Sequence, residues 1–267
     1  MTRAPDLEHP DFADFYDELP LWSAPFAQRI LERAPMARGL RILDVGCGSG
    51  FLSLEFAQRC GPDSRVWAID PWPAVMDRLE RKLSYHGISN VELVRRDATN
   101  TGLPNAIADL VVSNLGINNF DDPDAVLAEC RRTLKVGGKL ILTTNLSGHM
   151  AEVYELLREI AGDDVERRSL IDAQEAHRGS VASVTSRLTA AGFERVRHET
   201  STYPMRFADG TSLMGHWLMR LAFVPSWAAV VGEEAVSVLE QRLDARARDK
   251  GELALTIPVA LFEATRP

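Results

Sequence analysis

Short apolar runs alternate with amphipathic stretches from Arg41 to Thr144, and this alternation restricts the fold more than any other feature of the 267-residue chain. The apolar runs predict strands over residues 41–45, 65–69, 91–95, 109–113 and 139–144. The amphipathic stretches predict helices over residues 50–60, 73–86 and 123–134. Repeated strand–helix units with continuously apolar strands are typical of a parallel sheet covered by helices on both faces. We therefore expect an α/β fold with a doubly wound sheet.

The first predicted strand leads through a glycine loop, Gly46-Cys-Gly-Ser-Gly50, directly into a helix. Glycines let a backbone turn sharply and let a ligand approach it closely. The free N–H groups at a helix start attract negative charge. Such loops also join strands to helices for purely structural reasons, so the loop alone leaves both interpretations open.

Four polar residues stand at or just after the ends of predicted strands: Asp44, Asp70, Asp97 and Asn114. In open parallel sheets, ligands bind beyond the carboxyl ends of the strands. Aspartate and asparagine at strand ends also cap turns, which accounts for one or two such residues. The recurrence of all four predicts a binding site at this edge of the sheet.

The residue types around this edge favour a cationic nucleoside over a dinucleotide. Asp70 lies 20 residues after Gly50, the spacing expected of an acid that binds ribose hydroxyls. The third glycine comes one residue too early for the dinucleotide fingerprint, and the carboxylate of Asp44 would repel a pyrophosphate. Asp97 supplies an acceptor for an adenine amino group. A ribose, an adenine and a cationic tail occur together in S-adenosylmethionine.

The stretch Ile42-Leu-Asp-Val-Gly-Cys-Gly-Ser-Gly50, with Asp70, Asp97, Asp109-Leu-Val-Val-Ser-Asn114 and Leu134-Lys-Val-Gly-Gly-Lys-Leu140, resembles the class I S-adenosylmethionine-dependent methyltransferases of the small-molecule type. The resemblance runs from about residue 41 to residue 144. It implies S-adenosylmethionine as the cofactor. It also implies a seven-stranded, mostly parallel sheet whose last strand is antiparallel, with residues 193–203 and 253–264 as its terminal pair.

The resemblance further implies a cofactor site near the strand ends, made of Asp44, Gly46, Cys47, Gly48, Gly50, Asp70, Pro71, Trp72, Asp97, Ala98, Asn114 and Leu115. The glycines would approach the methionine part, Asp44 would orient its ammonium group, and Asp70 would hold the ribose hydroxyls. Pro71 and Trp72 would border the adenine. Asp97 and Ala98 would recognise its edge. Residues 114 and 115 would line the site near the sulfonium.

Segments outside this core extend the prediction in two places. Residues 1–38 are rich in aromatics and are expected to form a helical flap, with Ser23 as a helix N-cap and Pro25 in the first turn. Tyr16 and Trp22 suit contact with the cofactor or its acceptor best, because each joins an apolar face to a polar tip. The alternative is a helix that only packs on the sheet.

The pattern changes after residue 144. Helices are predicted over residues 150–160 and 181–191, with a charged, turn-rich stretch over residues 163–179 between them. Residues 204–251 form an insertion that carries Phe207, His216, Trp217, Phe223 and Trp227 and ends in an amphipathic helix. This insertion is either an apolar cap over the acceptor or a packing element, including a homodimer interface. We expect one domain over 1–267, with its core in residues 39–203 and 252–267.

Composition and cysteine usage restrict the class of protein. A formal net charge of −8 argues against a general nucleic-acid binder. Three scattered cysteines give neither a disulfide framework nor a zinc motif, so we expect a reducing, cytoplasmic setting and no metal. No apolar run approaches the roughly 20 residues that span a membrane. Cys47 sits where a small residue is common, which favours packing over redox chemistry.

Methyl transfer from a sulfonium requires orientation more than acid–base chemistry, because the leaving group departs as a neutral thioether. A general base matters only for a hydroxyl or similar nucleophile, for which His149 and His216 are weak candidates. Residues 113–120 lack the prolines of amino-methylating DNA enzymes. We expect a methyltransferase that acts on a small organic acceptor. The alternatives are a catalytically silent cofactor-binding module and a nicotinamide oxidoreductase.

Overall fold

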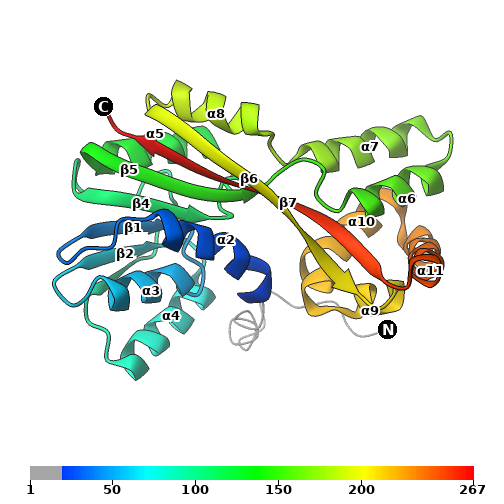
Figure 1. Cartoon of the computed structure of the whole chain (residues 1–267), viewed down its shortest axis with the longest axis horizontal. Helices are drawn as coiled ribbons and strands as arrows, with labels where there is room; N and C mark the ends of the chain where they lie inside the picture. Colours follow the sequence, from blue (N-terminus) through cyan, green and yellow to red (C-terminus); the bar gives the residue numbers. More distant parts are fainter. Residues whose placement is uncertain (1–19) are drawn as a thin grey trace. The chain divides into compact units, whose positions relative to one another are not determined.

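The computed structural model describes residues 20–267, and Figure 1 labels the elements. The strands are β1 Arg41–Val45, β2 Arg65–Ile69, β3 Val91–Val94, β4 Ala108–Asn114, β5 Leu134–Asn145, β6 Glu194–Phe207 and β7 Leu253–Thr265. The helices are α2 Pro20–Arg33, α3 Phe51–Arg59, α4 Pro73–His86, α5 Pro123–Thr133, α6 Ala151–Ala161, α7 Val165–Ala176, α8 Val181–Ala190, α9 Gly210–Gly215, η1 Met219–Phe223 (a π-helical turn), α10 Val224–Val231 and α11 Glu233–Lys250. The predicted α/β fold is confirmed.

The strands form one seven-stranded sheet in the order β3-β2-β1-β4-β5-β7-β6. The strands from β3 to β5 in this order all run parallel to one another. Two hydrogen bonds show that β7 runs antiparallel to β5: Gly137 N donates to Arg266 O, and Leu146 N donates to Pro258 O. The predicted mostly parallel sheet with its terminal pair of strands is therefore confirmed. The strand order reverses between β1 and β4, which opens a crevice at their carboxyl ends.

Burial explains why the apolar runs form central strands. In β1 and β2 the first residue is exposed and the other four are buried. Ile42, Val66 and Leu110 pack with Phe56 of α3 in one core cluster, while alternate residues such as Leu43 are fully buried on the other face. Both faces of the sheet are therefore covered, as continuous apolar strands require.

Two helices differ from the sequence prediction. Ser23 and Pro25 both lie inside α2, so Ser23 is not its N-cap. A proline inside a helix removes one backbone donor and crowds the preceding turn, which costs about 3 kcal/mol. The buried residues that follow it, Phe26, Ala27 and Ile30, pack in the core and stabilise α2 against this cost.

Residues 165–176 form α7 instead of a turn-rich stretch. Ile171 is its only buried residue, so α7 lacks the apolar period that reveals a helix, and the Asp164 cap supports its start.

The stretch Lys135-Val-Gly-Gly138 predicts a turn just before the expected strand over residues 139–144, but it lies inside β5. Ala108 pairs with Leu134, but Leu110 pairs with Lys139, so β5 carries extra residues that bulge out of the ladder. Gly137 has a φ of 77°, which a glycine adopts without strain. The turn signal was correctly located, but it marks a bulge within one strand.

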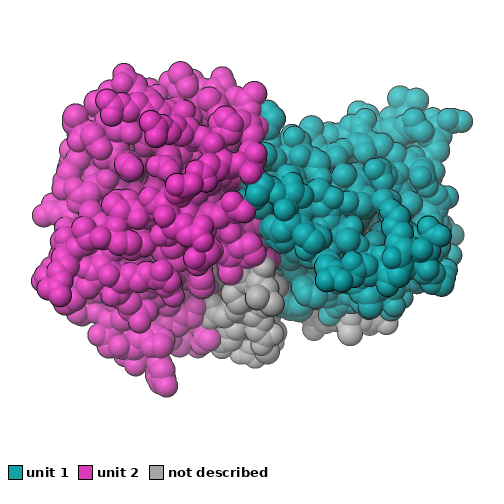
Figure 2. Space-filling model, in the orientation of Figure 1, with its two compact units in different colours: residues 1–7, 145–180, 201–259 teal, residues 8–144, 181–200, 260–267 magenta. Residues whose placement is uncertain are grey.

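The described residues fall into two compact units, which Figure 2 colours separately. The first, called the sheet unit here, holds the described chain up to Thr144 together with Val181–Thr200 and Ala260–Pro267. The second, called the helical unit, holds Asn145–Ser180 and Ser201–Val259, and thus the whole predicted insertion. The division into flap, core and insertion within a single domain stays a prediction.

Helix length and hydropathy bear on whether the chain could cross a membrane. Among residues 20–267, no single helix is long and apolar enough to span one. The helices over Met219–Val231 and Glu233–Lys250 meet the length and composition requirement only when taken together, and they are bent by 117°.

Candidate functional site

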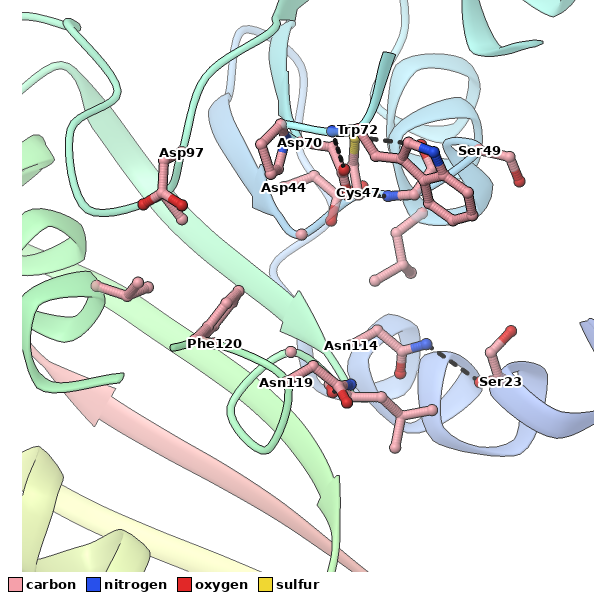
Figure 3. A pocket seen from close by; sticks show the side chains of 18 of the residues that line it. Ser23, Asp44, Cys47, Ser49, Asp70, Trp72, Asp97, Asn114, Asn119 and Phe120 are labelled. Carbon is pink, nitrogen blue, oxygen red and sulfur yellow. Dashed lines mark hydrogen bonds between the residues drawn. The ribbon is translucent and has the colours of Figure 1, made fainter. Parts of the chain in front are cut away.

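A cavity of about 770 Å³ lies in the sheet unit at the carboxyl ends of β1, β2 and β4 (Figure 3). This size is typical of small-molecule sites. Its walls hold every described residue that was predicted to bind the cofactor except Gly50: Trp22, Asp44, Gly46, Cys47, Gly48, Asp70, Pro71, Trp72, Asp97, Ala98, Asn114 and Leu115. Tyr16 lies outside the described residues.

The glycine loop after β1 depends on glycine at its last position. Gly46, Gly48 and Gly50 all have positive φ values, of 70°, 54° and 86°. A Cβ atom on Gly50 would lie 2.2 Å from Leu79 Cδ1 of α4, so a side chain there would force the buried Leu79 side chain to move. Gly50 therefore contributes to the site by allowing the loop and α4 to approach each other, although it does not line the cavity.

Asp70 connects the loop after β1 with the loop after β2. Its Oδ2 accepts a hydrogen bond from Gly48 N at 3.0 Å, and its Oδ1 accepts one from Trp72 N at 3.0 Å. Burial raises the pKa of this carboxyl group, while the two backbone donors oppose that rise. A carboxylate offers about four lone-pair positions, so both oxygens can still accept from two neighbouring hydroxyl groups.

Asp44 is almost completely enclosed, with 1% of its surface exposed. Ser53 Oγ donates to its Oδ2 at 2.6 Å. Burial raises the pKa of Asp44 to about 7, and the nearby charge of Asp70 also raises it. A buried carboxylate with this pKa gains most from a cationic partner, because such a partner stabilises the ionised form.

Asp97 presents an acceptor from the loop after β3. Thr99 donates to its Oδ1 twice, from the backbone N at 2.8 Å and from Oγ1 at 2.6 Å. These bonds lower the pKa of the exposed Asp97 carboxyl group and keep it ionised. The neighbouring Ala98 is 5% exposed and is therefore packed within the protein next to that carboxylate.

The end of β4 attaches α2 to the site. Asn114 Nδ2 donates to Ser23 O at 3.3 Å, and Thr143 Oγ1 donates to Asn114 Oδ1 at 2.8 Å. Figure 3 shows the amide of Asn114 directed toward Ser23.

α2 packs on the sheet through Ala27 and Ile30 and also places Trp22 at the cavity. Its Phe26 is fully buried. The role of α2 as a flap over the ligand stays a prediction.

The sequence left Asn119 open between a turn former and a lining residue, and it lines the cavity. Sequence reasoning missed the other lining residues: Ser23, Ser49, Phe51, Leu52, Thr99, Gly116, Phe120, Asp121, Asp122 and Val126. Phe120 is the most informative of them. A Cβ atom on Gly46 would lie 3.4 Å from Phe120 Cε1, and one on Gly116 would lie 2.5 Å from its Cζ. Its ring thus lies against two glycines that are far apart in the chain. The only local signal for this contact is Gly116, which lies in the same loop as Phe120.

The lining residues carry negative charge only. Five aspartates line the cavity, and the lining includes no lysine, arginine or histidine among the described residues. The field of several carboxylates in a partly enclosed cavity attracts cations and repels phosphate groups. The charge of the site agrees with a cationic ligand and disagrees with a dinucleotide.

Cys47 packs against α4. Its Sγ lies 3.6 Å from Met76 Sδ. Burial raises the pKa of the thiol well above its usual value, so it stays protonated and unreactive. Within residues 20–267, no three His, Cys, Asp or Glu side chains are grouped so that they could hold a metal ion.

The two histidine candidates belong to the helical unit and do not line the cavity. His149 is fully buried, and its ring centroid lies 5.5 Å from that of Phe223. Burial, and then the charge of Arg178, lowers the pKa of His149 well below its usual value. His216 stacks edge-on against Phe207 at 5.4 Å, and burial lowers its pKa. Their part in binding an acceptor stays a prediction.

The aromatic side chains of the insertion serve partly as core. Phe223 is 6% exposed and Trp227 is fully buried, with ring centroids 6.1 Å apart. Phe207 and Trp217 are half-buried. The first pair stabilises the helical unit from inside, so at most the second pair is available for the predicted apolar cap.

Comparison with known proteins shows which families and structures this chain is similar to. Residues 43–142 match the family described as "Methyltransferase domain". The chain is 29% identical over 177 residues to the ubiquinone/menaquinone biosynthesis C-methyltransferase UbiE of Bordetella avium, covering 62% of this chain and 68% of that one. It is 27% identical over 250 residues to nocamycin O-methyltransferase of Saccharothrix syringae, covering 88% and 89%. The structure of a Bacillus halodurans protein described as a putative methyltransferase shares the fold, with a TM-score of 0.62 at 18% identity over 90% of this chain and 98% of that one.

Proposed function

We propose that the chain is a class I S-adenosylmethionine-dependent methyltransferase and that it methylates a small organic acceptor. Residues 43–142 match a methyltransferase domain family, and the relatives over longer stretches carry the names of methyltransferases. Its relatives include enzymes named for ubiquinone/menaquinone biosynthesis, nocamycin, aklanonic acid and malonyl-[acyl-carrier protein]. They carry the names of both C- and O-methyltransferases. A small acceptor that presents a carbon or an oxygen nucleophile is the class that these relatives support.

The proposal rests on one observation: Asp44, Asp70 and Asp97 border a single cavity whose described lining includes no basic residue. S-adenosylmethionine supplies a methyl group carried on positively charged sulfur. Asp70 would hold the ribose hydroxyls, since its carboxylate already links two loops of the site. Asp44 would face the ammonium group, and Asp97 with Ala98 would bind the adenine edge.

The residues of this site bind and orient the reactants, and they transfer no proton to the leaving group. Correct orientation contributes about 7–11 kcal/mol in favourable cases. Asn114 and Leu115 would border the reacting end, where Asn114 is fixed by Thr143 and by α2. No base is assigned, because neither histidine candidate lines the cavity.

The partners are inferred from charge and composition. The net charge of −8 supports an acceptor other than nucleic acid. The acidic lining of the cavity also disfavours a nucleic-acid acceptor at the site itself. A homodimer formed through the insertion and a cytoplasmic location stay predictions.

Isothermal titration of the protein with S-adenosylmethionine, S-adenosylhomocysteine and NAD tests the cofactor. We expect heat from the first two and none from NAD. Binding of NAD alone would contradict the proposal and favour an oxidoreductase.

A screen of small acceptors with methyl-labelled cofactor tests the transfer. We expect label in a quinone-like, polyketide-like or carboxylate acceptor, and much less label with the Asp70→Ala variant at a cofactor concentration that does not saturate it. Cofactor binding without transfer to any acceptor would favour the silent module. Transfer to a protein partner only would overturn the small-molecule class.

A further inference from the structure

The loop that carries Asp97 is attached to α5 by a hydrogen-bond network. The proposed cofactor contacts assign no role to this network. Immediately after Asp97 the chain makes a tight turn, in which Asn100 N donates to Asp97 O at 3.1 Å. Thr99 occupies Asp97 Oδ1 with both its backbone N–H and its hydroxyl. Oδ2 is thereby left as the oxygen that can face a ligand, and the carboxylate is held in one rotamer.

The network continues at Thr101, which is 3% exposed. Its backbone N and its Oγ1 donate to Glu129 Oε1 of α5, at 2.9 and 2.6 Å. Glu129 is 8% exposed, so the contact is shielded from water. The chain two residues after Thr99 is therefore attached to a rigid helix by two hydrogen bonds to a carboxylate, the stronger kind of hydrogen bond.

Arg132 completes the network. Its Nε donates to Glu129 Oε2 at 2.6 Å, and its Nη2 donates to Glu129 Oε1 at 2.7 Å and to Leu103 O at 2.8 Å. Both ends of the Thr101–Leu103 segment are thus attached to α5. If the two side chains separated, the buried charge of Glu129 would lose its partner, which is energetically costly. The ion pair is therefore held in this geometry.

We propose that Thr99 and Glu129 are positioning residues, which fix Asp97 Oδ2 so that the site selects adenine over other purines. This inference rests on the proposed function, in which Asp97 binds the adenine edge. The amino group of adenine donates a hydrogen bond to a carboxylate. Hypoxanthine carries a carbonyl oxygen at the same position, and an ionised carboxylate repels it. A fixed Asp97 enforces this difference, whereas an Asp97 that can rotate turns away from the carbonyl and tolerates it.

The test compares dissociation constants for S-adenosylhomocysteine and S-inosylhomocysteine, measured by isothermal titration. The two probes differ only in the base, so a loss of general stability or of ribose binding affects both equally. We expect the wild type to prefer the adenine probe by at least about tenfold, the value of one charge-assisted hydrogen bond. Thr99→Val and Glu129→Ala should each reduce this preference by about threefold or more, and Thr99→Ser should restore it.

Matched controls remove similar contacts elsewhere in the sheet unit. Thr189→Val removes a hydroxyl that bonds Thr185 O on α8, and Glu55→Ala removes a carboxylate that pairs with Arg59 on α3. Both should leave the preference unchanged. Thr101→Val removes only the buried hydroxyl, so it replaces Glu129→Ala if that variant does not fold.

The outcomes separate this inference from the proposed function. If Asp97→Asn abolishes the preference while Thr99→Val and the Glu129 or Thr101 variant keep it, the positioning inference is wrong and the role of Asp97 stands. If Asp97→Asn keeps the preference, the role of Asp97 in base recognition is wrong, and the positioning inference falls with it. An equal loss of affinity for both probes identifies the network as purely structural.

Discussion

The two units use polar side chains in opposite ways. In the sheet unit, Asp70 and Asp97 line a cavity and take hydrogen bonds from nearby backbone amides. In the helical unit, His149, Tyr154 and Trp227 are all buried in the core, where Arg178 Nη1 donates to Tyr154 Oη at 3.3 Å. Parallel strands that end at one edge must expose the residues just beyond their carboxyl ends, whereas amphipathic helices bury aromatic side chains whatever polar atoms these carry. Residue type alone therefore does not identify a site.

The contrast between core and site residues predicts its largest effect, on the free energy of unfolding, in the helical unit. Trp227→Ala should lower the free energy of unfolding by about 3–5 kcal/mol, because it removes a fully buried side chain. Among the described residues the indole Nε1 has no hydrogen-bond partner. Trp227→Phe should therefore keep most of the stability. Chemical denaturation measures both variants, and an effect below about 1 kcal/mol for Trp227→Ala would contradict the core assignment.

Asp70→Ala should have the next largest effect, on affinity. It removes the carboxylate that would bind the ribose and the anchor for Gly48 N and Trp72 N. We expect S-adenosylmethionine to bind about 100-fold more weakly, since two charge-assisted hydrogen bonds contribute about 3 kcal/mol or more. Asp63→Ala is the control, because Asp63 is exposed just before β2. Equal affinities for the two variants would remove Asp70 from the site.

Asp44 should make both stability and affinity depend on pH. Burial raises its pKa to about 7, so between about pH 4 and 7 the folded chain keeps a proton that the unfolded chain has lost. The stability of the ligand-free protein should therefore fall as pH rises through this range and level off above it. Asp44→Asn should reduce this slope, and Asp70, whose pKa burial also raises, should account for part of what remains. Thermal unfolding at pH 5, 6, 7 and 8 measures the slope.

The same ionisation should govern cofactor affinity in the other direction. A cationic cofactor favours the ionised carboxylate, so its affinity should rise about tenfold from pH 6 to pH 8 in the wild type and change little in Asp44→Asn. Titrations in buffers of different ionisation heat should show a proton released on binding at pH 6.5. Equal pH profiles for the two proteins would contradict a direct charge interaction at Asp44.

The smallest effect is expected at Cys47. Its protonated thiol lies between the glycines of the loop and contacts Met76. Among the described residues that line the cavity, the thiol bonds only to its neighbour Gly48. Cys47→Ala should cost about 1 kcal/mol of stability or less and change cofactor affinity by less than about threefold. Iodoacetamide should modify the native thiol slowly at pH 8, as mass spectrometry can follow. Rapid alkylation would show a reactive thiolate and would contradict the assignment of Cys47 as a packing residue.

Local patterns were sufficient where one period or one turn signal decided the structure. The bounds of β1, β2 and α4 agree with the prediction to the residue, because their apolar runs end at Asp, Gly or Pro. Pattern reasoning failed for α7, whose single buried residue Ile171 leaves no apolar period to detect. It also left Phe223 and Trp227 open between core and cap, since both environments favour the same aromatic residues.

The sequence by itself determined the sheet, the resemblance to a methyltransferase family and the carboxylates at the strand ends, because strand polarity and chain order bring those residues to one edge. Only the tertiary structure decided how the carboxylates are held. Gly48 meets Asp70 across 22 positions of the chain, and Thr101 meets Glu129 across 28. Such contacts have no period along the chain, since they depend on how helices and loops pack once the sheet has formed. Packing likewise decided the burial that raises the pKa of Asp44 to about 7.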